Sequence, residues 1–259
     1  MLQKRQVGIL DRLGDRKSAV TTLTRDYPPG HTIPLHFHDR DQLVYASLGV
    51  MTVRTRDGTW VVPPHRAVWI PAEIPHTITM SGAVAMRTLY LTPRLAKGLP
   101  RDCCVISVSS LLKELILYAC TLRALKKSVE WQGQLIGVIL YQLKTVQMVP
   151  LQLPHLSDPR LVRISEIFIK NPSDDRTLAQ LCRVSGASKR SVERLFQREI
   201  GMTFGRWRQQ LRLMQGMRLL AEGAKVTDAA MESGYSTPSA FISMFRKTLG
   251  MTPTSYFRR

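Results

Sequence analysis

The pattern of hydrophobic and polar residues divides the chain into regions of different secondary structure. Between residues 20 and 92, short runs rich in Val, Thr, Ile, Tyr and Trp alternate with turn sequences such as Pro28-Pro29-Gly30 and Arg56-Asp57-Gly58. Short strands at this spacing predict a small β-sandwich or β-barrel. From residue 109 to 148, apolar residues recur every three or four positions, and this spacing predicts two amphipathic helices.

A proline-rich stretch, residues 149–159, interrupts the periodic pattern. It suits neither a helix nor a strand and is typical of a linker. All later segments have helical spacing, including one uninterrupted helix expected over residues 204–221. The sequence therefore predicts an α+β multidomain chain, with a β-domain at residues 1–104, a helical segment at residues 105–150 and an all-α domain at residues 157–259.

Two stretches of the all-α region repeat each other. Residues 178–203 correspond to residues 226–252, with an offset of 48 positions between Ser188 and Ser236 and of 49 between Phe196 and Phe245. The second copy therefore carries one extra residue, inside its second helix or at the start of that helix. A repeat of this length indicates a duplicated supersecondary unit.

Each copy has the sequence pattern of a helix-turn-helix. Gly186 and Gly234 occupy the position where a helix ends in a left-handed residue, and Ser188 and Ser236 follow two positions later, where a hydroxyl can cap the next helix. Pro238 suits the first turn of the second helix. One such pattern occurs in any helical hairpin, but two copies favour a DNA-binding domain.

The charge of the chain supports this interpretation. The formal net charge is +18, and residues 159–259 contain 18 Lys and Arg against 8 Asp and Glu, with Arg at 14 of those 18 positions. Arg forms bidentate contacts with phosphate and with guanine. A merely basic soluble surface is the alternative, and the two repeats favour nucleic-acid binding over it.

The sequence also bears on the compartment. No segment reaches the roughly 18 continuous apolar residues of a membrane span, and charged residues interrupt the first twenty positions, as they do not in a signal peptide. Cys103 and Cys104 are adjacent, which is poor geometry for a disulfide between them. We therefore expect a cytoplasmic protein.

The end of the second repeat, Phe245-Arg-Lys-Thr-Leu-Gly-Met-Thr-Pro-Thr-Ser-Tyr256, resembles the DNA-binding domain of AraC/XylS-type transcriptional regulators. The resemblance implies that the second helix of each repeat lies in the major groove of DNA. It places the first reading helix at residues 189–197 and the second reading helix at residues 238–247. The DNA-contacting residues that it implies are Ser188, Lys189, Arg190, Glu193, Arg194, Ser236, Thr237, Pro238, Ser239 and Ser243.

The two reading helices differ in the contacts that they can make. In the first, Arg190 and Arg194 are expected to pair with guanine, and Glu193 to accept from cytosine. Arg194 could instead contact phosphate, and Glu193 could pair with Lys189 or Arg190 in the same helix. The second reading helix carries Ser243 where an Arg is common in the family, so we expect phosphate contacts and weaker apolar or hydroxyl contacts there.

The N-terminal half resembles a cupin barrel, the sensor domain of many AraC-type proteins. Its two motifs are matched by the spacings Gly30-x5-His36-x-His38-x3-Gln42-x6-Gly49 and Pro71-x-Glu73-x2-His76. On one continuous strand, residues 36, 38, 40, 42 and 44 share a face by parity. We therefore expect an effector site inside the barrel mouth, formed by His36, His38, Gln42 and His76.

The same four residues are candidate metal ligands. Enzymatic cupins usually carry Glu at the place of Gln42, Gly at that of Glu73 and Asn at that of Met80, and all three differ here. A shell of neutral imidazoles and one amide does not offset the charge of a divalent metal, so we expect weak affinity for the ion. A divalent metal, hydrogen bonds to the effector and a purely structural histidine cluster all stay open.

These observations predict a transcriptional regulator rather than an enzyme. We expect the barrel to bind a small-molecule effector, the helices of residues 109–148 to pair two subunits into a homodimer, and the all-α domain to bind double-stranded promoter DNA, with RNA polymerase as a further partner. The resemblance also suggests a neighbouring transporter or metabolic gene as the target, and leaves activator and repressor open.

Two other functions are weighed against this one. The first is a metal-dependent cupin enzyme, such as a dioxygenase or an isomerase, against which the absent carboxylate and the DNA-binding domain argue. The second is a DNA binder without sequence preference, against which the unequal reading helices and the separate barrel argue.

Overall fold

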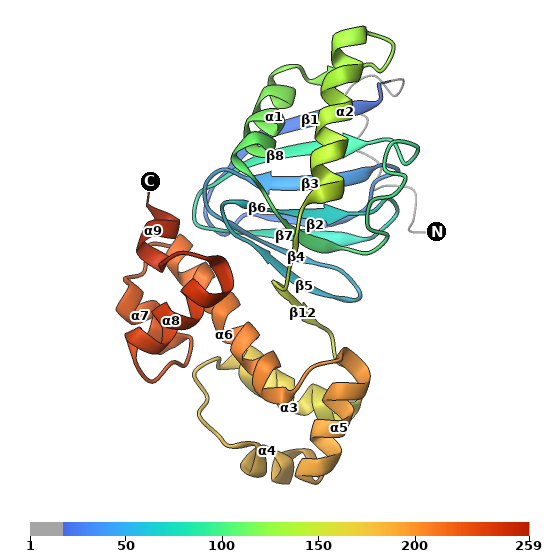
Figure 1. Cartoon of the computed structure of the whole chain (residues 1–259). Coiled ribbons are helices and arrows are strands. Elements are labelled where there is room, and N and C mark those ends of the chain that lie inside the picture. The colour runs from blue at the N-terminus through green and yellow to red at the C-terminus, as the bar shows by residue number, and fades with distance from the viewer. Residues whose placement is uncertain (1–17, 259) are drawn as a thin grey trace. The chain divides into compact units, whose positions relative to one another are not determined.

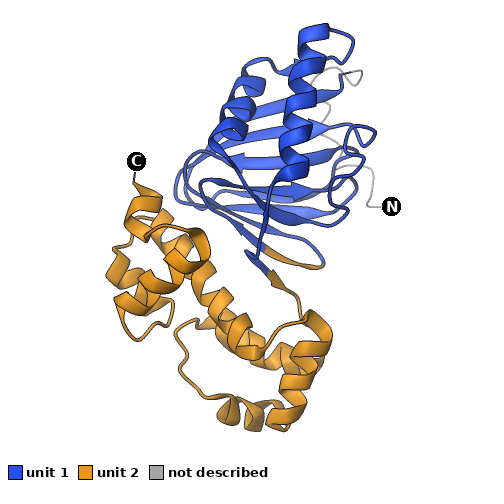
Figure 2. Cartoon of the chain, in the orientation of Figure 1, with its two compact units in different colours: residues 1–56, 60–152 blue, residues 57–59, 153–259 orange. Residues whose placement is uncertain are grey.

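The structure is a computed structural model that describes residues 18–258. The chain forms two compact units that divide between Gln152 and Leu153, inside the expected linker, with residues 57–59 grouped with the second unit (Figure 2). No helix in the described range is long and apolar enough to cross a membrane. The predicted fold class is confirmed, because the N-terminal unit is built on β-sheets and the C-terminal unit is helical (Figure 1).

The described part of the first unit contains two sheets, whose strands follow the runs of β-branched and aromatic residues in the sequence. In spatial order, the seven-stranded sheet consists of β10 (Ala124–Leu125), β1 (Val20–Tyr27), β8 (Val84–Leu91), β3 (Asp41–Ala46), β6 (Arg66–Ile70), β9 (Cys104–Ser107) and β11 (Met148–Val149). The five-stranded sheet consists of β12 (Gln152–Pro154), β5 (Gly58–Val62), β4 (Val50–Arg54), β7 (His76–Ser81) and β2 (Thr32–His36).

Two helices cover the outer face of the seven-stranded sheet (Figure 1). α1 (Ser110–Thr121) begins at Ser109, whose hydroxyl accepts from the Leu112 N–H, and α2 (Glu130–Thr145) follows. Alternate residues of the sheet, among them Leu43 and Leu89, share a core with the buried helix residues Leu112, Ile116, Ala119, Ile136, Ile139 and Leu143. Because both faces of its central strands are covered, β3 is buried along its whole length.

The expectation that the linker contains no strand is wrong. β11 pairs with β9, and β12 lies beside β5, so the proline-rich stretch adds one short strand to each sheet. Pro150 separates the two strands and Pro154 ends the second. Edge strands tolerate proline because one of their sides makes no ladder hydrogen bonds.

The second unit is helical and contains the two expected helix-turn-helix units, α4 with α5 and α7 with α8. Its helices are α3 (Pro159–Lys170), α4 (Leu178–Ser185), α5 (Lys189–Ile200), α6 (Phe204–Ala221), α7 (Val226–Glu232), α8 (Pro238–Leu249) and α9 (Pro253–Phe257). α6 spans the predicted residues 204–221 and joins the two helix-turn-helix units. On the first side it buries Phe204 and Trp207 against Phe196 of α5, and further along it Gly216 meets the ring of Phe241 of α8.

The two turns confirm most of the predicted pattern. Gly186 and Gly234 both have left-handed backbone, with φ of 69° and 90°, and the Ser188 hydroxyl caps α5. Ser236 is not the cap of α8, because the hydroxyl that accepts from the helix N–H of Ala240 belongs to Thr237. The extra residue of the second copy therefore lies in the turn, at the start of the helix, and it moves the capping position by one.

Candidate functional site

α5, the first reading helix, is amphipathic along its whole length. It buries Val192, Leu195 and Phe196 in the core of its helix-turn-helix unit. The opposite face carries exposed polar and charged residues, which are Lys189, Arg190, Glu193, Arg194 and Gln197. Ser188 lies at the N-terminus of this face, where its Oγ accepts from the Ser191 N–H at 3.2 Å.

The two candidate reading arginines are available for a ligand. Arg190 and Arg194 lie one turn apart, and neither side chain makes a hydrogen bond or ion pair with any described residue. Glu193 has its carboxylate 4.0 Å from the ammonium of Lys189. An exposed pair at this spacing stabilises a helix by only about 0.5 kcal/mol, so DNA can displace it at little cost.

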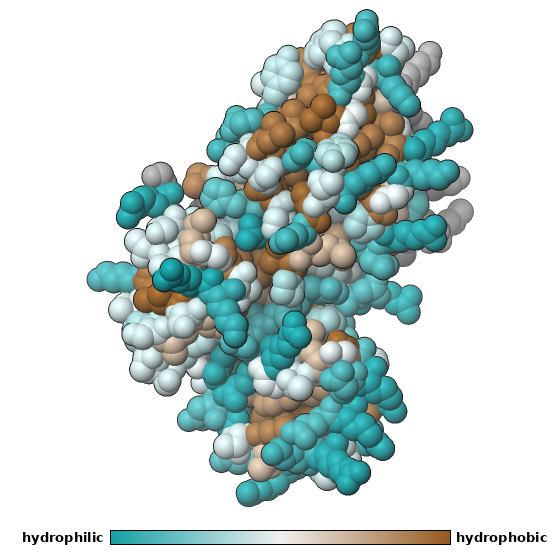
Figure 3. Space-filling view, in the orientation of Figure 1, coloured by the Kyte–Doolittle hydropathy of each residue, from teal (hydrophilic) through white to brown (hydrophobic). Residues whose placement is uncertain are grey.

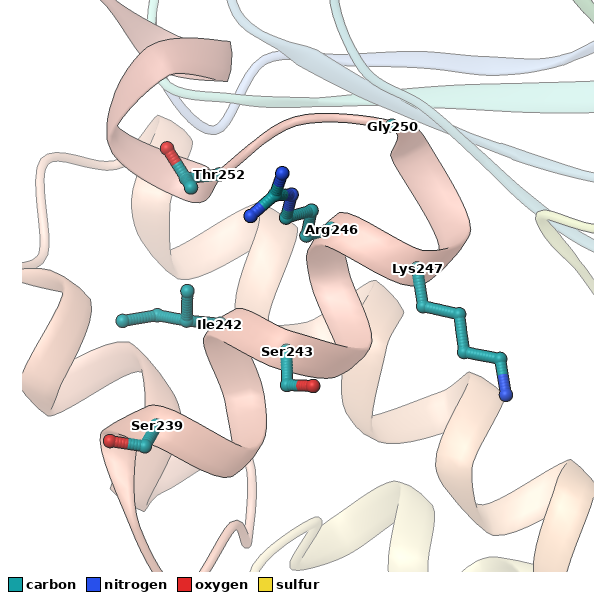
Figure 4. Close-up of a pocket in the computed structure, with 7 residues that line it drawn as sticks. All are labelled: Ser239, Ile242, Ser243, Arg246, Lys247, Gly250 and Thr252. Atoms are coloured by element: carbon teal, nitrogen blue, oxygen red, sulfur yellow. The ribbon is translucent and has the colours of Figure 1, made fainter.

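α8, the second reading helix, presents a different surface. It buries Phe241, Met244, Phe245 and Leu249, and its other face lines an open hollow of about 610 Å³ (Figure 4). The lining residues are Ser239, Ile242, Ser243, Arg246, Lys247, Gly250 and Thr252. The N-terminal half of this face carries hydroxyl and apolar groups, and the cations lie in the last turn of the helix (Figure 4).

The other residues expected on this side lie in the turn. Ser236 is exposed before the helix, Thr237 uses its hydroxyl as the cap, and Pro238 occupies the first helical turn. Arg246 and Lys247 were missed from the sequence as DNA-contact candidates. The helical spacing of Ser239, Ser243, Arg246 and Lys247 was the signal that could have found them.

In the first unit, three histidine rings meet in a buried cluster. The ring centroids of His36 and His76 are 4.3 Å apart, those of His36 and His38 are 4.8 Å apart, and those of His38 and His76 are 5.5 Å apart. Nδ1 of His36 lies 2.7 Å from the Pro34 carbonyl oxygen, and Nδ1 of His76 lies 2.8 Å from that of Ile74. Since a carbonyl only accepts, both rings carry their proton on Nδ1 and keep a lone pair on Nε2.

The cluster is neutral at neutral pH. Burial, together with the charges of neighbouring imidazoles, lowers the pKa of His38 to about 3 and that of His76 to about 4. Burial also lowers the pKa of His36. Neither ring nitrogen of His38, nor Nε2 of His76, has a hydrogen-bond partner among the described residues. Buried polar atoms usually find partners, so these nitrogens are candidates to face a bound molecule.

Gln42 lies beside this cluster through a residue that the motifs did not include. Its amide Nε2 donates to the hydroxyl of Tyr90 at 3.2 Å, and the Tyr90 ring lies 4.9 Å from that of His38. Gln42 and Tyr90 are register partners on β3 and β8. The missed Tyr90 could have been found only from strand pairing, which local spacing does not give.

One continuous strand is not what brings the histidines together, and that expectation is wrong. β2 ends at His36, and Gln42 lies on β3 in the other sheet, so residues 37–40 cross between the sheets. The Glu73 N–H donates to the His38 carbonyl at 2.8 Å and holds this crossing. Glu73 has a φ of 64°, a left-handed value that glycine adopts without strain, which fits the glycine found there in enzymatic cupins.

Comparison with known proteins supports both halves of this description. The family pattern described as "AraC-like ligand binding domain" matches residues 18–127, and the one described as "Helix-turn-helix domain" matches residues 181–259. The HTH-type transcriptional regulator NimR of Escherichia coli (strain K12) is 33% identical over 228 residues, which cover 88% of this chain and 83% of NimR. The chain belongs to the AraC family.

Other similarities cover less or are weaker. The HTH-type transcriptional regulator RipA of Corynebacterium glutamicum is 29% identical over 104 residues, or 40% of this AraC-family chain and 31% of RipA. Among solved structures, ToxT from Vibrio cholerae with a bound unsaturated fatty acid has a TM-score of 0.38 at 12% identity, over 94% of this chain and 97% of ToxT.

Membership of the family settles the general activity. This AraC-family chain is a DNA-binding transcriptional regulator with a ligand-binding domain for a small-molecule effector, and it is not an enzyme. The alternatives of a cupin enzyme and of a structural DNA binder are thereby set aside.

The histidines of this regulator have the donor set that a divalent transition metal needs. Their ligand atoms lie within 4.8 Å of one another. The Nδ1 bonds of His36 and His76 orient the two rings, as second-layer bonds do around bound metals. No carboxylate joins the group among the described residues, so the charge of an ion would be offset only by the molecule that it binds.

Proposed function

We propose that the regulator reads promoter DNA chiefly through α5 and that α8 anchors the second half of the binding site to the DNA backbone. The observation that carries the proposal is the contrast between the two exposed faces. Arg190 and Arg194 lie in the N-terminal half of the α5 face, the part of a recognition helix that contacts base edges, whereas the cations Arg246 and Lys247 of α8 lie at its C-terminal end.

Selection of bound duplexes from a random DNA pool tests this division. We expect one half-site with strong base preferences and a second half-site, about one helical turn away, with weak ones. Two half-sites with equally strong preferences would contradict the unequal roles. The selected sequence also points to the regulated genes.

We further propose that the effector binds at the histidine cluster, with Gln42 and Tyr90 at its edge. The unpartnered ring nitrogens of His38 and His76 support this site, because they are buried polar atoms that a ligand would satisfy. A divalent metal is proposed as a weakly held part of the site. Three neutral imidazoles suit Zn²⁺ in type, but they supply no negative charge.

Zinc titration followed by calorimetry tests the metal part, with His76→Ala and with His31→Ala as the matched control. His31 is an exposed residue that stacks on Tyr27 and lies outside the cluster. We expect one weak site per chain, lost in His76→Ala and kept in His31→Ala, and less than one metal per chain in protein as purified. Zinc binding that survives His76→Ala would contradict the site.

The effector part of the site is tested in a promoter-reporter strain. His36→Ala and His76→Ala should abolish the response to the effector and leave operator binding unchanged, because the reading helices lie in the other compact unit. A full effector response in both variants would show that the effector binds elsewhere.

We propose that the regulator is a homodimer paired through α1 and α2. The outer faces of these helices expose large apolar side chains, and hydrophobic atoms gather over both helices (Figure 3). The exposed residues are Leu111, Tyr118, Trp131, Val138 and Tyr141. Leu111 and Tyr118, like Trp131 and Val138, are seven positions apart and so share a helix face. A second copy of the same face would cover them.

Sedimentation of Leu111→Glu and Val138→Glu tests the dimer, with Leu48→Glu as the control. Leu48 is an exposed leucine of the same unit outside these helices. We expect folded monomers with weaker operator binding from the first two variants and an unchanged dimer from the third. Folded dimers from all three would exclude this surface.

RNA polymerase is a further proposed partner at the promoter, and we propose that the regulator acts in the cytoplasm. Transcription with purified polymerase distinguishes activation from repression.

A further inference from the structure

Two arginines of α6 hold the loop that leads into the first helix-turn-helix unit. Arg208 donates through Nη1 to the Arg176 carbonyl at 3.2 Å and through Nη2 to the Asp174 carbonyl. Arg212 donates through Nε to the Pro172 carbonyl at 3.3 Å and through Nη2 to the Asp174 carbonyl at 3.1 Å. Three alternate backbone carbonyls of the loop therefore face α6. We call these two arginines and residues 172–176 the arginine clamp.

The loop side of the clamp is braced from within. The carboxylate of Asp174 accepts from the backbone N–H of Arg176 at 3.0 Å and from its Nη2 at 2.7 Å. The Arg176 guanidinium beside it holds the pKa of Asp174 below its usual value. The guanidinium of Arg208 also lies over the ring of Phe168 in α3, 4.7 Å from its centroid. These contacts keep the three carbonyls pointing in one direction.

The turn of the second helix-turn-helix unit closes on the same groups. A Cβ atom added to Gly234 would lie 2.6 Å from the Pro172 carbonyl oxygen and 2.7 Å from Nε of Arg212. Next to it, Tyr235 packs on Phe241 of α8 with ring centroids 5.3 Å apart. The clamp therefore touches both units: its loop leads into α4, and its Arg212 lies against the turn that leads into α8.

The clamp is an expensive arrangement. Both guanidinium groups are half-buried, and burial lowers the pKa of each, while the positive charge of Arg212 lowers that of Arg208 further. The hydrogen-bond partners of the two cations are backbone carbonyls, which carry only partial charge, and the nearby carboxylates of Asp174 and Asp175 offset only part of the effect of burial. Apolar residues would fill the same space at a lower desolvation cost. The arrangement is better explained by the geometry that it imposes than by stability.

We propose that Arg208, Arg212 and Gly234 are positioning residues that fix the separation and angle of α5 and α8, and so restrict the regulator to one spacing of its two half-sites. The proposal rests on the proposed function, in which both helices contact DNA. α6 alone fixes the distance along its axis. The clamp adds a second connection beside the helix and so prevents the two units from twisting about it.

Operator duplexes with one or two base pairs inserted between the half-sites test this proposal. Each insertion rotates one half-site by about 34° and moves it by about 3.4 Å. We expect wild-type affinity to fall about 10-fold or more per insertion, as it does when specific contacts are lost. Arg212→Met and Arg208→Met remove the donors and keep an apolar stem, and in them the loss per insertion should be less than about 3-fold. Arg206→Met is the control, an exposed arginine of α6 whose side chain makes no hydrogen bond or ion pair with a described residue.

Two outcomes overturn the clamp: the same spacing profile in folded Arg212→Met as in the wild type, or no spacing preference in the wild type. Failure of the proposed function is detected by a separate measurement. If α5 does not read bases, base changes in its half-site leave the affinity of the wild-type protein unchanged. Spin labels at Gln197→Cys and Ser243→Cys, with the native cysteines replaced by alanine, give a readout free of DNA. Electron paramagnetic resonance should show a narrow distribution of distances between the two labels. We expect Arg212→Met to broaden this distribution and Arg206→Met to leave it unchanged. Equal widths in all three proteins would also overturn the proposal.

Discussion

The first helix-turn-helix unit turns at Gly186 in open space, whereas the second turns at Gly234 against a carbonyl and a guanidinium. The exposed faces of the two reading helices also differ, in where their cations lie. α5 presents free arginines in its N-terminal half, and α8 presents hydroxyl groups there and carries its cations in its last turn. The two copies of the duplicated motif thus differ in both respects: the first has an open turn and the second a closely packed one, and their exposed faces carry cations at different positions along the helix.

The packing of α8 on the long helix shows the same closure. A Cβ atom on Gly216 of α6 would lie 2.6 Å from the ring of Phe241, so this glycine admits the ring to the helix backbone. The first unit packs on α6 through the larger side chains of Phe204 and Trp207. A unit held this closely has little freedom to adjust to DNA, which suits an anchor better than a reader.

The largest effect that separates the two turns is expected from alanine at the two glycines. Both residues have left-handed backbone, which costs alanine about 1–2 kcal/mol. Gly234→Ala must also move the Pro172 carbonyl or Arg212, and such overpacking adds about 1–3 kcal/mol. We expect Gly234→Ala to lower the unfolding free energy of the second compact unit by about 3 kcal/mol, and Gly186→Ala to lower it by about 1 kcal/mol.

Denaturant unfolding of the two alanine variants measures this difference. Gly186→Ala is the matched control, because it carries the backbone strain without the clash. Equal losses of stability would show that the turn at Gly234 relaxes freely and that the two units are alike in this respect.

The next largest effect concerns the reading faces. Arg190→Ala and Arg194→Ala should each weaken binding to the selected operator by about 1–3 kcal/mol, because a bidentate contact to guanine is lost, and should spare most non-specific binding. Ser243→Ala, the corresponding change in α8, should be mild. Affinities for operator and random duplexes at one salt concentration give the comparison. If both arginine variants lost affinity for all sequences equally, α5 would be a phosphate-binding helix.

Local sequence was enough to predict the duplicated unit. A left-handed glycine, a hydroxyl cap and helical spacing are properties of neighbouring residues, so Gly186, Ser188 and the span of α6 follow from the chain itself. The cap at Thr237 in place of Ser236 was missed because the offset alone did not locate the extra residue. The environment of Gly234 was beyond reach, because its contacts with Pro172 and Arg212 come from distant parts of the sequence.

The histidine cluster was predicted correctly for a reason that was partly wrong. The motif spacing brought His36, His38 and His76 together, and they do lie together, but the chain crosses between two sheets inside the first motif. Parity applies only within one strand, so it could not describe that crossing. Tyr90 joins Gln42 through strand pairing across many residues, and such pairing is not encoded in local spacing.

The smallest change in free energy, and the most specific for the anchor, is the change that each single α8 cation makes to the salt dependence of binding. Affinity for the operator should fall about 10³-fold or more between 50 and 200 mM salt if six or more phosphates are contacted. Arg246→Gln and Lys247→Gln should each reduce the slope of log K against log salt by about 0.9, the value for one lost phosphate contact, without changing the preferred sequence. Lys225→Gln, an exposed cation before α7 and outside the α8 hollow, is the control and should keep the slope. A change of base preference in Arg246→Gln, with the slope unaltered, would make α8 a second reader and remove the contrast between the two units.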